Sequence, residues 1–325
     1  MADYKTLHGT HIEVVASDPS NPIDGQLWYN TTSQTMKGRI LSAAAWASGG
    51  NLNTARSLMG SAGTQTAALA VGGDSGSPPP PGRDLAITES YNGSAWSEVG
   101  DLNATRRRLS STGTSTSAIA AGGFVPPSVA LAETWNGTSW TEVGDLNAAK
   151  SSTGMSGADN TAALIFCGGN TNNTVELWNG TSWTEVADLN TAGYGGTGTG
   201  TATAAICFDR ADTEDTAQTV VETWDGTSWT EVANLNTPRF YTGGAGLVTA
   251  ALCFGGTSDP SALHEEWNGS AWTEITDLST GRAGVGGTGI STLAIAFGGA
   301  PPYTNVTEEF TAATSSTVTF DATDV

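Results

Sequence analysis

The feature that most constrains this chain is a fifteen-residue string that recurs along it with few changes. Residues 133–147 read Glu-Thr-Trp-Asn-Gly-Thr-Ser-Trp-Thr-Glu-Val-Gly-Asp-Leu-Asn, and related strings occupy 89–103, 176–190, 222–236 and 265–279. A truncated copy that ends at Asn53 precedes them. The second tryptophan of successive copies is separated by 50, 44, 43, 46 and 43 residues, at Trp46, Trp96, Trp140, Trp183, Trp229 and Trp272. A period of this length indicates one supersecondary unit stacked several times.

A second recurring piece lies between these strings. A basic residue follows each Leu-Asn closely, and small polar residues then lead into an apolar run that ends in Gly-Gly. The basic residues are Arg56, Arg106, Lys150, Arg239 and Arg282, and the glycine pairs are 72–73, 122–123, 168–169, 255–256 and 298–299. The fourth repeat departs twice, with Gly193 in place of the arginine and Phe208-Asp209 in place of the glycine pair.

One repeat, residues 107–144, divides into four short runs bounded by turn residues. We expect strands in the small-residue run after Arg106, at 117–121, at 131–135 and at 140–143. Asn136-Gly137 supplies the positive φ angles that a tight hairpin between the last two strands needs. Each repeat therefore predicts a four-stranded sheet with small residues on its first strand and tryptophans on its outer strands.

The combination of an apolar run ending in Gly-Gly, Glu-x-aromatic-Asn/Asp, Trp and Leu-Asn-x-x-Arg resembles the Kelch repeat of β-propellers. The truncated first copy lacks its Glu-x-aromatic half, which Thr307–Phe310 supply at the other end of the chain. We therefore predict an all-β, six-bladed Kelch-like propeller over residues 40–310. Its ring would be closed by the C-terminal strand pairing with the N-terminal strand, so that no sheet edge is left exposed.

The segments outside the repeats point to an assembly. Residues 1–39 predict a strand at 11–15 and a hairpin at 25–39, and residues 311–325 form a Ser/Thr-rich tail. The segment Gly-Gln-Leu-Trp-Tyr-Asn-Thr-Thr resembles hairpins in virion structural proteins of tailed bacteriophages, and the Trp-Asn-Gly-Thr-Ser-Trp repeats resemble phage propeller proteins. The resemblance implies a multicopy virion protein that contacts other virion proteins through its two terminal segments, with Leu27, Trp28 and Tyr29 as anchoring residues.

Composition excludes several partners. The formal net charge of −20 repels phosphate backbones and anionic lipid headgroups, so we expect neither nucleic acid nor membrane as a partner. No stretch approaches the length of about 20 apolar residues that a membrane span needs. The N-terminal residues show no secretory pattern, and Cys167, Cys207 and Cys253 lie in apolar runs, which favours buried thiols and synthesis in a reducing cytoplasm.

The sequence offers little for catalysis. Kelch proteins that resemble galactose oxidase hold copper with histidine and tyrosine, but His264 is the single histidine within the repeats. A sialidase-like site needs an arginine cluster, and we expect the local cluster Arg106-Arg107-Arg108 to be solvated or to lie between blades. We therefore predict no catalytic residue and no cofactor. A carbohydrate-active propeller enzyme and a cytosolic Kelch adaptor remain the alternatives to a virion protein.

The repeated charged and aromatic residues have structural explanations. A catalytic pair is needed once, whereas one glutamate and one cation recur in every repeat, so we predict ion pairs within or between blades. The tryptophans that flank each Asn-Gly turn could stack on sugar rings, but cross-strand packing is the favoured interpretation. The repeated glutamates are Glu89, Glu133, Glu176, Glu222, Glu265 and Glu308.

Variable loops are the expected recognition surface. Strand direction places the uniform turns between strands one and two and between strands three and four on one face, where we expect residues 1–39 and 311–325 to anchor the protein. The loops between strands two and three lie on the other face and differ in every repeat. An acidic loop in the fourth repeat is a weak calcium candidate through Asp209, Asp212, Glu214 and Asp215. The candidate ligand-loop residues are Asp74, Pro79, Arg83, Phe124, Pro126, Asp212 and Asp259.

Overall fold

The computed structural model describes residues 12–76, 83–169, 173–257 and 261–320. The chain divides into two units, which we name by their content. The six-sheet unit comprises Trp46–Thr311, and the terminal unit comprises Met1–Ala45 together with Ala312–Val325. The candidate residues Pro79 and Asp259 lie outside the described residues. No helix long and apolar enough to cross a membrane occurs in these described ranges.

The described residues of the repeat region form six four-stranded antiparallel sheets and one small two-stranded sheet. Five sheets take their strands in chain order, whereas the sixth has the order β27-β28-β29-β4 and so includes a strand from the start of the repeats. The first three sheets contain β5 (Gly60–Thr64), β6 (Ala67–Asp74), β7 (Asp84–Tyr91), β8 (Trp96–Glu98), β9 (Ser110–Gly113), β10 (Ala118–Ala121), β11 (Ala132–Trp135), β12 (Trp140–Glu142), β13 (Gly154–Asp159), β14 (Ala162–Phe166), β15 (Val175–Trp178) and β16 (Trp183–Val186). The other sheets contain β17 (Thr197–Gly200), β18 (Ala205–Phe208), β19 (Arg210–Ala211), β20 (Ala217–Gln218), β21 (Glu222–Trp224), β22 (Trp229–Glu231), β23 (Gly243–Leu247), β24 (Ala250–Phe254), β25 (His264–Trp267), β26 (Trp272–Glu274), β27 (Gly286–Ile290), β28 (Leu293–Phe297), β29 (Thr307–Thr311) and β4 (Ala45–Ser48).

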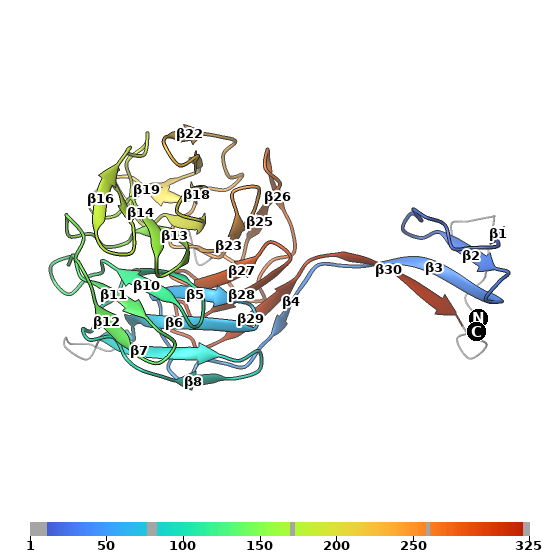
Figure 1. The fold of residues 1–325 in the computed structure, drawn as a ribbon, viewed down its shortest axis with the longest axis horizontal. Coiled ribbons are helices and arrows are strands. Elements are labelled where there is room, and N and C mark those ends of the chain that lie inside the picture. The colour runs from blue at the N-terminus through green and yellow to red at the C-terminus, as the bar shows by residue number, and fades with distance from the viewer. Residues whose placement is uncertain (1–11, 77–82, 170–172, 258–260, 321–325) are drawn as a thin grey trace. The chain divides into compact units, whose positions relative to one another are not determined.

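The first strands of the six sheets contact one another in a cycle. Strand β5 contacts β9, and the contacts continue through β13, β17, β23 and β27 back to β5. Figure 1 shows first strands toward the centre of this unit and fourth strands such as β16 and β22 at its periphery. Hydroxyl groups join neighbouring first strands, since Thr112 Oγ1 donates to the Gly157 carbonyl over 2.8 Å and Thr288 Oγ1 donates to the Gly63 carbonyl over 2.7 Å.

In four of the six sheets the second strand ends in a phenylalanine, and this ring requires small residues on the first strands that it packs against. A Cβ added at Gly243 would lie 2.3 Å from a ring carbon of Phe254, and one added at Gly286 would lie 2.3 Å from Phe297. This explains physically why the sequence places glycine, serine and threonine on the strand nearest the centre.

Tryptophan pairs fill the space between neighbouring sheets. Trp135 and Trp140 face each other across β11 and β12 with ring centroids 5.4 Å apart, and both are buried. They pack on Leu69, Val71 and other residues of the preceding sheet. The tryptophans are therefore occupied by packing between sheets and do not present their faces to a sugar ring.

The buried glutamates link consecutive sheets. Each of these glutamates accepts a hydrogen bond from the backbone N–H of a residue in the crossing that follows the preceding outer strand, for example Asn236 N to Glu265 Oε2 at 2.8 Å. The Asn236 amide also donates to Glu265 Oε2 and to the Trp272 carbonyl. The expected cations complete the arrangement, in the pairs Arg56–Glu89, Arg106–Glu133, Lys150–Glu176, Arg239–Glu265 and Arg282–Glu308.

The fourth sheet keeps this ion pair by an exchange of positions. The positions of the glycine pair are held by Asp209-Arg210 and not by the expected Phe208-Asp209, because Phe208 ends its strand as Phe254 does and Asp209 has φ +49°. Arg210 Nη2 lies 3.0 Å from Glu222 Oε1. Gly193 stands where the other repeats have their cation, and a Cβ there would lie only 2.9 Å from the Arg210 Cβ. The two departures seen in the fourth repeat are therefore one compensated change, with the guanidinium reaching the same carboxylate from the opposite strand.

The glycine pair of the third repeat differs from the expected 168–169. Cys167 has φ +52° and Gly168 has φ +112°, which match the φ angles of Gly255 and Gly256 in the fifth repeat. Cys167 therefore occupies the first position of the pair in a left-handed conformation. All three cysteines are free and buried, and the exposed fraction of each is zero.

The terminal unit is a separate four-stranded sheet with the order β1-β2-β3-β30. The predicted hairpin forms from β2 (Leu27–Asn30) and β3 (Thr35–Ser42), and β1 (Glu13–Val15) pairs parallel to β2. The C-terminal segment, which the sequence suggested as a separate tail, supplies β30 (Thr314–Phe320) and pairs antiparallel with β3 (Figure 1). Residues expected as two terminal segments thus belong to one sheet.

The exchange between Gly193 and Arg210 can be tested by reversal. Arg210→Gly removes the partner of a fully buried carboxylate and should lower the free energy of unfolding by about 3–5 kcal/mol. The double variant Gly193→Arg/Arg210→Gly restores the arrangement of the other repeats and should recover most of that loss in urea denaturation. A double variant no more stable than Arg210→Gly would contradict this explanation. Glu231→Gln, a change at an exposed residue of the same sheet, serves as the control.

Candidate functional site

A polar cavity lies at one end of the central axis of the six-sheet unit. Its volume is about 100 Å³, and every one of the six sheets contributes lining residues. A second cavity of about 240 Å³ opens among the turns between first and second strands. The two cavities share one lining residue from each sheet, namely Ser61, Ser111, Met155, Gly198, Gly244 and Gly287. The first cavity, which we call the axial pocket, lies at the end that carries the variable loops.

Six backbone hydrogen bonds form a closed cycle around the axial pocket. Leu58 N donates to the Gly284 carbonyl, Arg108 N donates to the Leu58 carbonyl, and both distances are 2.8 Å. The cycle continues through Ser152, Gly195 and Tyr241 and returns to Gly284, with every distance between 2.8 and 2.9 Å. Each sheet therefore contributes one N–H group and one carbonyl group to a ring that has no free end.

The residues of this hydrogen-bond cycle share an unusual backbone conformation. Leu58, Arg108, Ser152 and Tyr241 have φ between 53° and 57°, and the remaining two positions are glycines at φ +70° and +61°. A positive φ at leucine, arginine or tyrosine is strained and persists only where the surrounding structure imposes it. The strain marks this ring as a place where the fold constrains the backbone, and strain of this kind clusters at binding sites.

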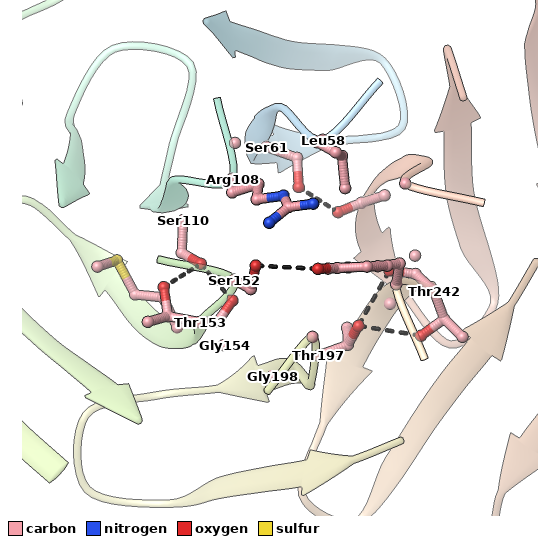
Figure 2. A pocket seen from close by; sticks show the side chains of 18 of the residues that line it. Leu58, Ser61, Arg108, Ser110, Ser152, Thr153, Gly154, Thr197, Gly198 and Thr242 are labelled. Carbon is pink, nitrogen blue, oxygen red and sulfur yellow. Dashed lines mark hydrogen bonds between the residues drawn. The ribbon is translucent and has the colours of Figure 1, made fainter. Parts of the chain in front are cut away.

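Three polar side chains project from the cycle. Ser152 Oγ and the Tyr241 hydroxyl are 3.1 Å apart, and Figure 2 shows the Arg108 guanidinium reaching into the axial pocket. The Arg108 Cζ lies 5.8 Å from the Phe124 ring centroid and 5.9 Å from that of Tyr241. We expected the cluster Arg106-Arg107-Arg108 to be solvated or to lie between blades. Instead its members separate, since Arg106 is buried with Glu133, Arg107 pairs with Asp84, and Arg108 lines the pocket.

A buried carboxyl group supports the floor of the axial pocket. Asp209 accepts hydrogen bonds from Thr242 Oγ1 at 2.7 Å, from Thr197 N at 2.9 Å and from Thr242 N at 3.2 Å. Both threonines line the pocket. Burial raises the pKa of Asp209 well above its usual range despite these donors. Asp209 therefore orders the pocket wall from behind and is itself fully buried.

The candidate ligand-loop residues have different environments. Asp74 is fully buried and ion-paired with Arg83, whose side chain is 41% exposed, so Asp74 itself is not available to a ligand. Phe124 lies under the guanidinium of Arg107, with Arg107 Cζ 4.8 Å from its ring centroid. Pro126 is exposed on the same loop. The loop between β6 and β7 therefore presents Arg83 and is stabilised internally by Asp74, and the loop between β10 and β11 presents Pro126.

Three of the four carboxylates of the calcium candidate, those of Asp209, Asp212 and Asp215, have separate partners. Asp209 is buried as described above, and Asp212 accepts hydrogen bonds from Glu214 N at 2.9 Å and Thr216 N at 3.0 Å within its own loop. Asp215 accepts a hydrogen bond from the Tyr194 hydroxyl. In the described parts of the chain, no group of three or more His, Cys, Asp or Glu side chains is placed to hold a metal ion.

The histidine within the repeats is buried between aromatic rings. Trp46 Nε1 donates to His264 Nδ1 over 3.1 Å, and the rings of Phe254 and Phe310 pack against His264. Burial lowers the pKa of His264 to about 4. A neutral, fully buried imidazole of this kind contributes to packing and has no contact with either axial cavity.

The expected anchoring residues are not equally available. Trp28 is the core of the terminal unit, with an exposed fraction of zero, and its Nε1 donates to Asp18 Oδ1 over 3.1 Å. Asn30 and Lys37 also donate to Asp18, and these hydrogen bonds lower its pKa to about 2. Because its ring is fully buried, Trp28 contributes to anchoring only by holding the terminal sheet together. Leu27 and Tyr29 are half-buried.

Comparison with known proteins identifies the architecture. No protein-family model matches the chain, and no curated protein matches it. A solved structure of the protein YjhT superposes with a TM-score of 0.67 at 11% sequence identity, over 82% of this chain and 99% of that chain. The fold is β-propeller-like. At this level of identity the likeness establishes the fold and leaves the function to be argued from the residues.

The buried His264 gives the propeller-like fold a predictable acid sensitivity. The unfolded chain binds a proton at His264 below about pH 6.5, whereas the folded chain does so only below about pH 4. The contribution of His264 to the free energy of unfolding is therefore fully present above pH 6.5 and decreases as the pH falls from 6.5 to 4. Protonation of this group lowers the free energy of unfolding by about 3 kcal/mol in total. In His264→Gln the free energy of unfolding should depend less on pH between 6.5 and 4, as measured by urea denaturation at a series of pH values. A variant with the same slope as the wild type would contradict the assignment.

Proposed function

We propose that the six sheets are the blades of one closed, Kelch-like propeller. The cyclic contacts of the first strands and the ring of six backbone hydrogen bonds both support closure, because each returns to its starting blade. The sheet order β28-β29-β4 supports closure by strand exchange, since Gly49 N donates to the Thr307 carbonyl over 2.9 Å. Closure of this kind leaves the sheets without an unprotected edge.

We further propose that the protein is a non-enzymatic bacteriophage virion protein, part of a tail or other appendage, in which the propeller is a binding or host-adhesion module. The observation that carries the proposal is the separation of the two ends of the blades. Thr311 pairs with Leu293, the first residue of β28, which follows the turn from β27. The chain therefore leaves the six-sheet unit among the uniform turns. The variable loops and the axial pocket lie at the other ends of the same strands.

The separate terminal sheet agrees with an attachment role. Strands from both ends of the chain combine there into an independent unit with its own buried tryptophan. Exposed apolar side chains of this unit, Val14 at 67% and Leu41 at 58%, are suited to contact a neighbouring virion protein. The ligand at the opposite face would be a surface glycan, a host receptor or another virion protein.

The virion proposal is tested by the composition of purified particles. We expect the chain in a mass-spectrometric inventory of virion substructures and an antibody against it to label an appendage in negative-stain images. We expect no hydrolysis or oxidation of glycans by the purified protein. Absence from particles would refute the proposal, and glycan turnover would favour the alternative of a carbohydrate-active propeller enzyme.

Ring closure makes a separate prediction about two truncations. Deletion of residues 304–325 removes β29 from the sixth sheet and should abolish a single cooperative melting transition, because β4 and β28 lose the strand between them. Deletion of residues 312–325 removes β30 alone and leaves the six-sheet unit intact, so its transition should persist. Calorimetry distinguishes the two, and an unchanged transition in the longer deletion would refute closure.

A further inference from the structure

Arg108 differs from every other described basic residue in having no carboxylate partner. The chain carries 32 acidic residues and a net charge of −20, and among the described ranges each remaining lysine and arginine forms an ion pair. These pairs are Lys37–Asp18, Arg39–Asp24, Arg56–Glu89, Arg83–Asp74, Arg106–Glu133, Arg107–Asp84, Lys150–Glu176, Arg210–Glu222, Arg239–Glu265 and Arg282–Glu308. In a chain so rich in carboxylates, an unpaired guanidinium requires an explanation.

The described lining of the axial pocket includes no acidic side chain, and the carboxyl group of Asp209 lies behind the lining residues Thr197 and Thr242. Nothing that lines the axial pocket is aspartate or glutamate, and Arg108 is its single charged residue. Arg108 Nε is buried without a hydrogen-bond partner in the described chain, a property that it shares with the Nε atoms of the ion-paired arginines Arg56, Arg106, Arg210, Arg239 and Arg282. The hydroxyl of Ser111, which lines the same pocket, is also buried without a partner. Ser152 and Tyr241 share one hydrogen bond between two hydroxyl groups, so one hydroxyl proton of the pair is left for a ligand.

The contribution of Arg108 to the hydrogen-bond cycle comes from its backbone and not from its side chain. Its N–H and carbonyl groups complete the hydrogen-bond cycle, and that contribution does not depend on the side chain. The side chain forms neither an ion pair nor a hydrogen bond in the described chain and passes within about 6 Å of two aromatic rings. Those rings orient the guanidinium without neutralising it.

We propose that the axial pocket binds an oxyanion, the carboxylate or sulfate group of an acidic ligand, with Arg108 as its charged hydrogen-bond donor. A guanidinium presents a planar fork of donors that matches these groups, and the Ser152 and Tyr241 hydroxyls lie on the same rim to complete the contact. The pocket volume of about 100 Å³ suits a charged group and its nearest atoms, with the rest of the ligand lying among the variable loops.

This inference deepens the proposed function and rests on it only for the assumption that the loop face meets an external ligand. Carboxylates and sulfates occur free and as groups on acidic saccharides, so the two sources need separate probes. A ligand recognised through one anionic group would be attracted locally even though the whole protein is strongly negative. Arg108 thus supplies a positive charge at the pocket in a protein whose net charge is negative.

The test is isothermal titration of the purified full chain with sodium sulfate, sodium acetate, sodium glucuronate and neutral glucose at constant ionic strength. We expect the three anions to bind and glucose not to bind. Arg108→Gln should weaken anion binding at least about tenfold, because a charge-assisted hydrogen bond is lost. Arg39→Gln removes an equal charge from the terminal unit, none of whose residues line the pocket, and should leave the affinity unchanged.

Two further variants keep the test decisive if Arg108→Gln is unstable. Arg108→Lys retains the charge and should bind sulfate more weakly than the wild type but measurably, whereas Tyr241→Phe keeps the ring and should weaken binding modestly. Glucuronate binding tighter than acetate would assign the site to acidic saccharides, and equal affinities would assign it to free oxyanions. Equal anion affinity of wild type and Arg108→Gln, or no anion binding by the wild type, would overturn the proposal. A virion inventory that lacks the chain would refute the proposed function without changing this titration.

Discussion

The carboxylate on the third strand of each sheet is the interaction on which the six-sheet unit depends. One oxygen of Glu265 accepts two hydrogen bonds from Asn236, and the other accepts one from Arg239. A single buried group therefore joins the crossing between two sheets to the sheet that follows. Charge burial of this kind is tolerated only when every lone pair is satisfied, which fixes the geometry of each crossing.

The fourth sheet shows that the chemistry of this interaction is conserved along the chain while its position is not. Arg210 and Gly193 have exchanged roles, and the carboxylate of Glu222 still receives its guanidinium. The axial strands meet a similar demand through size, because Phe254 and its counterparts leave no room for a Cβ opposite them. The hydrogen-bonded carboxylates at the crossings and the tight packing on the first strands therefore favour the same arrangement of sheets, although they use different residue types.

Much of this architecture could be predicted from the repeat, and the failures have identifiable causes. The period, the Asn-Gly turns and the recurring charges are local patterns, so the strand positions and the ion partners were accessible from the sequence. The pairing of β3 with β30 joins residues nearly 300 positions apart, and the tail has little apolar alternation to reveal it. The role of Trp28 as a core residue depends on Asp18, and the isolation of Arg108 from its neighbours depends on left-handed φ angles that residue type alone does not disclose.

The pairing of β3 with β30 also determines how mechanical load would pass through the molecule. Seven residue pairs join these antiparallel strands, from Ser42 opposite Thr314 to Met36 opposite Phe320. Strand β3 leads into β4, and β29 leads into β30, and both β4 and β29 belong to one sheet. A pull on the terminal unit is therefore divided between two covalent connections that end on adjacent strands, so the load does not fall on one strand alone.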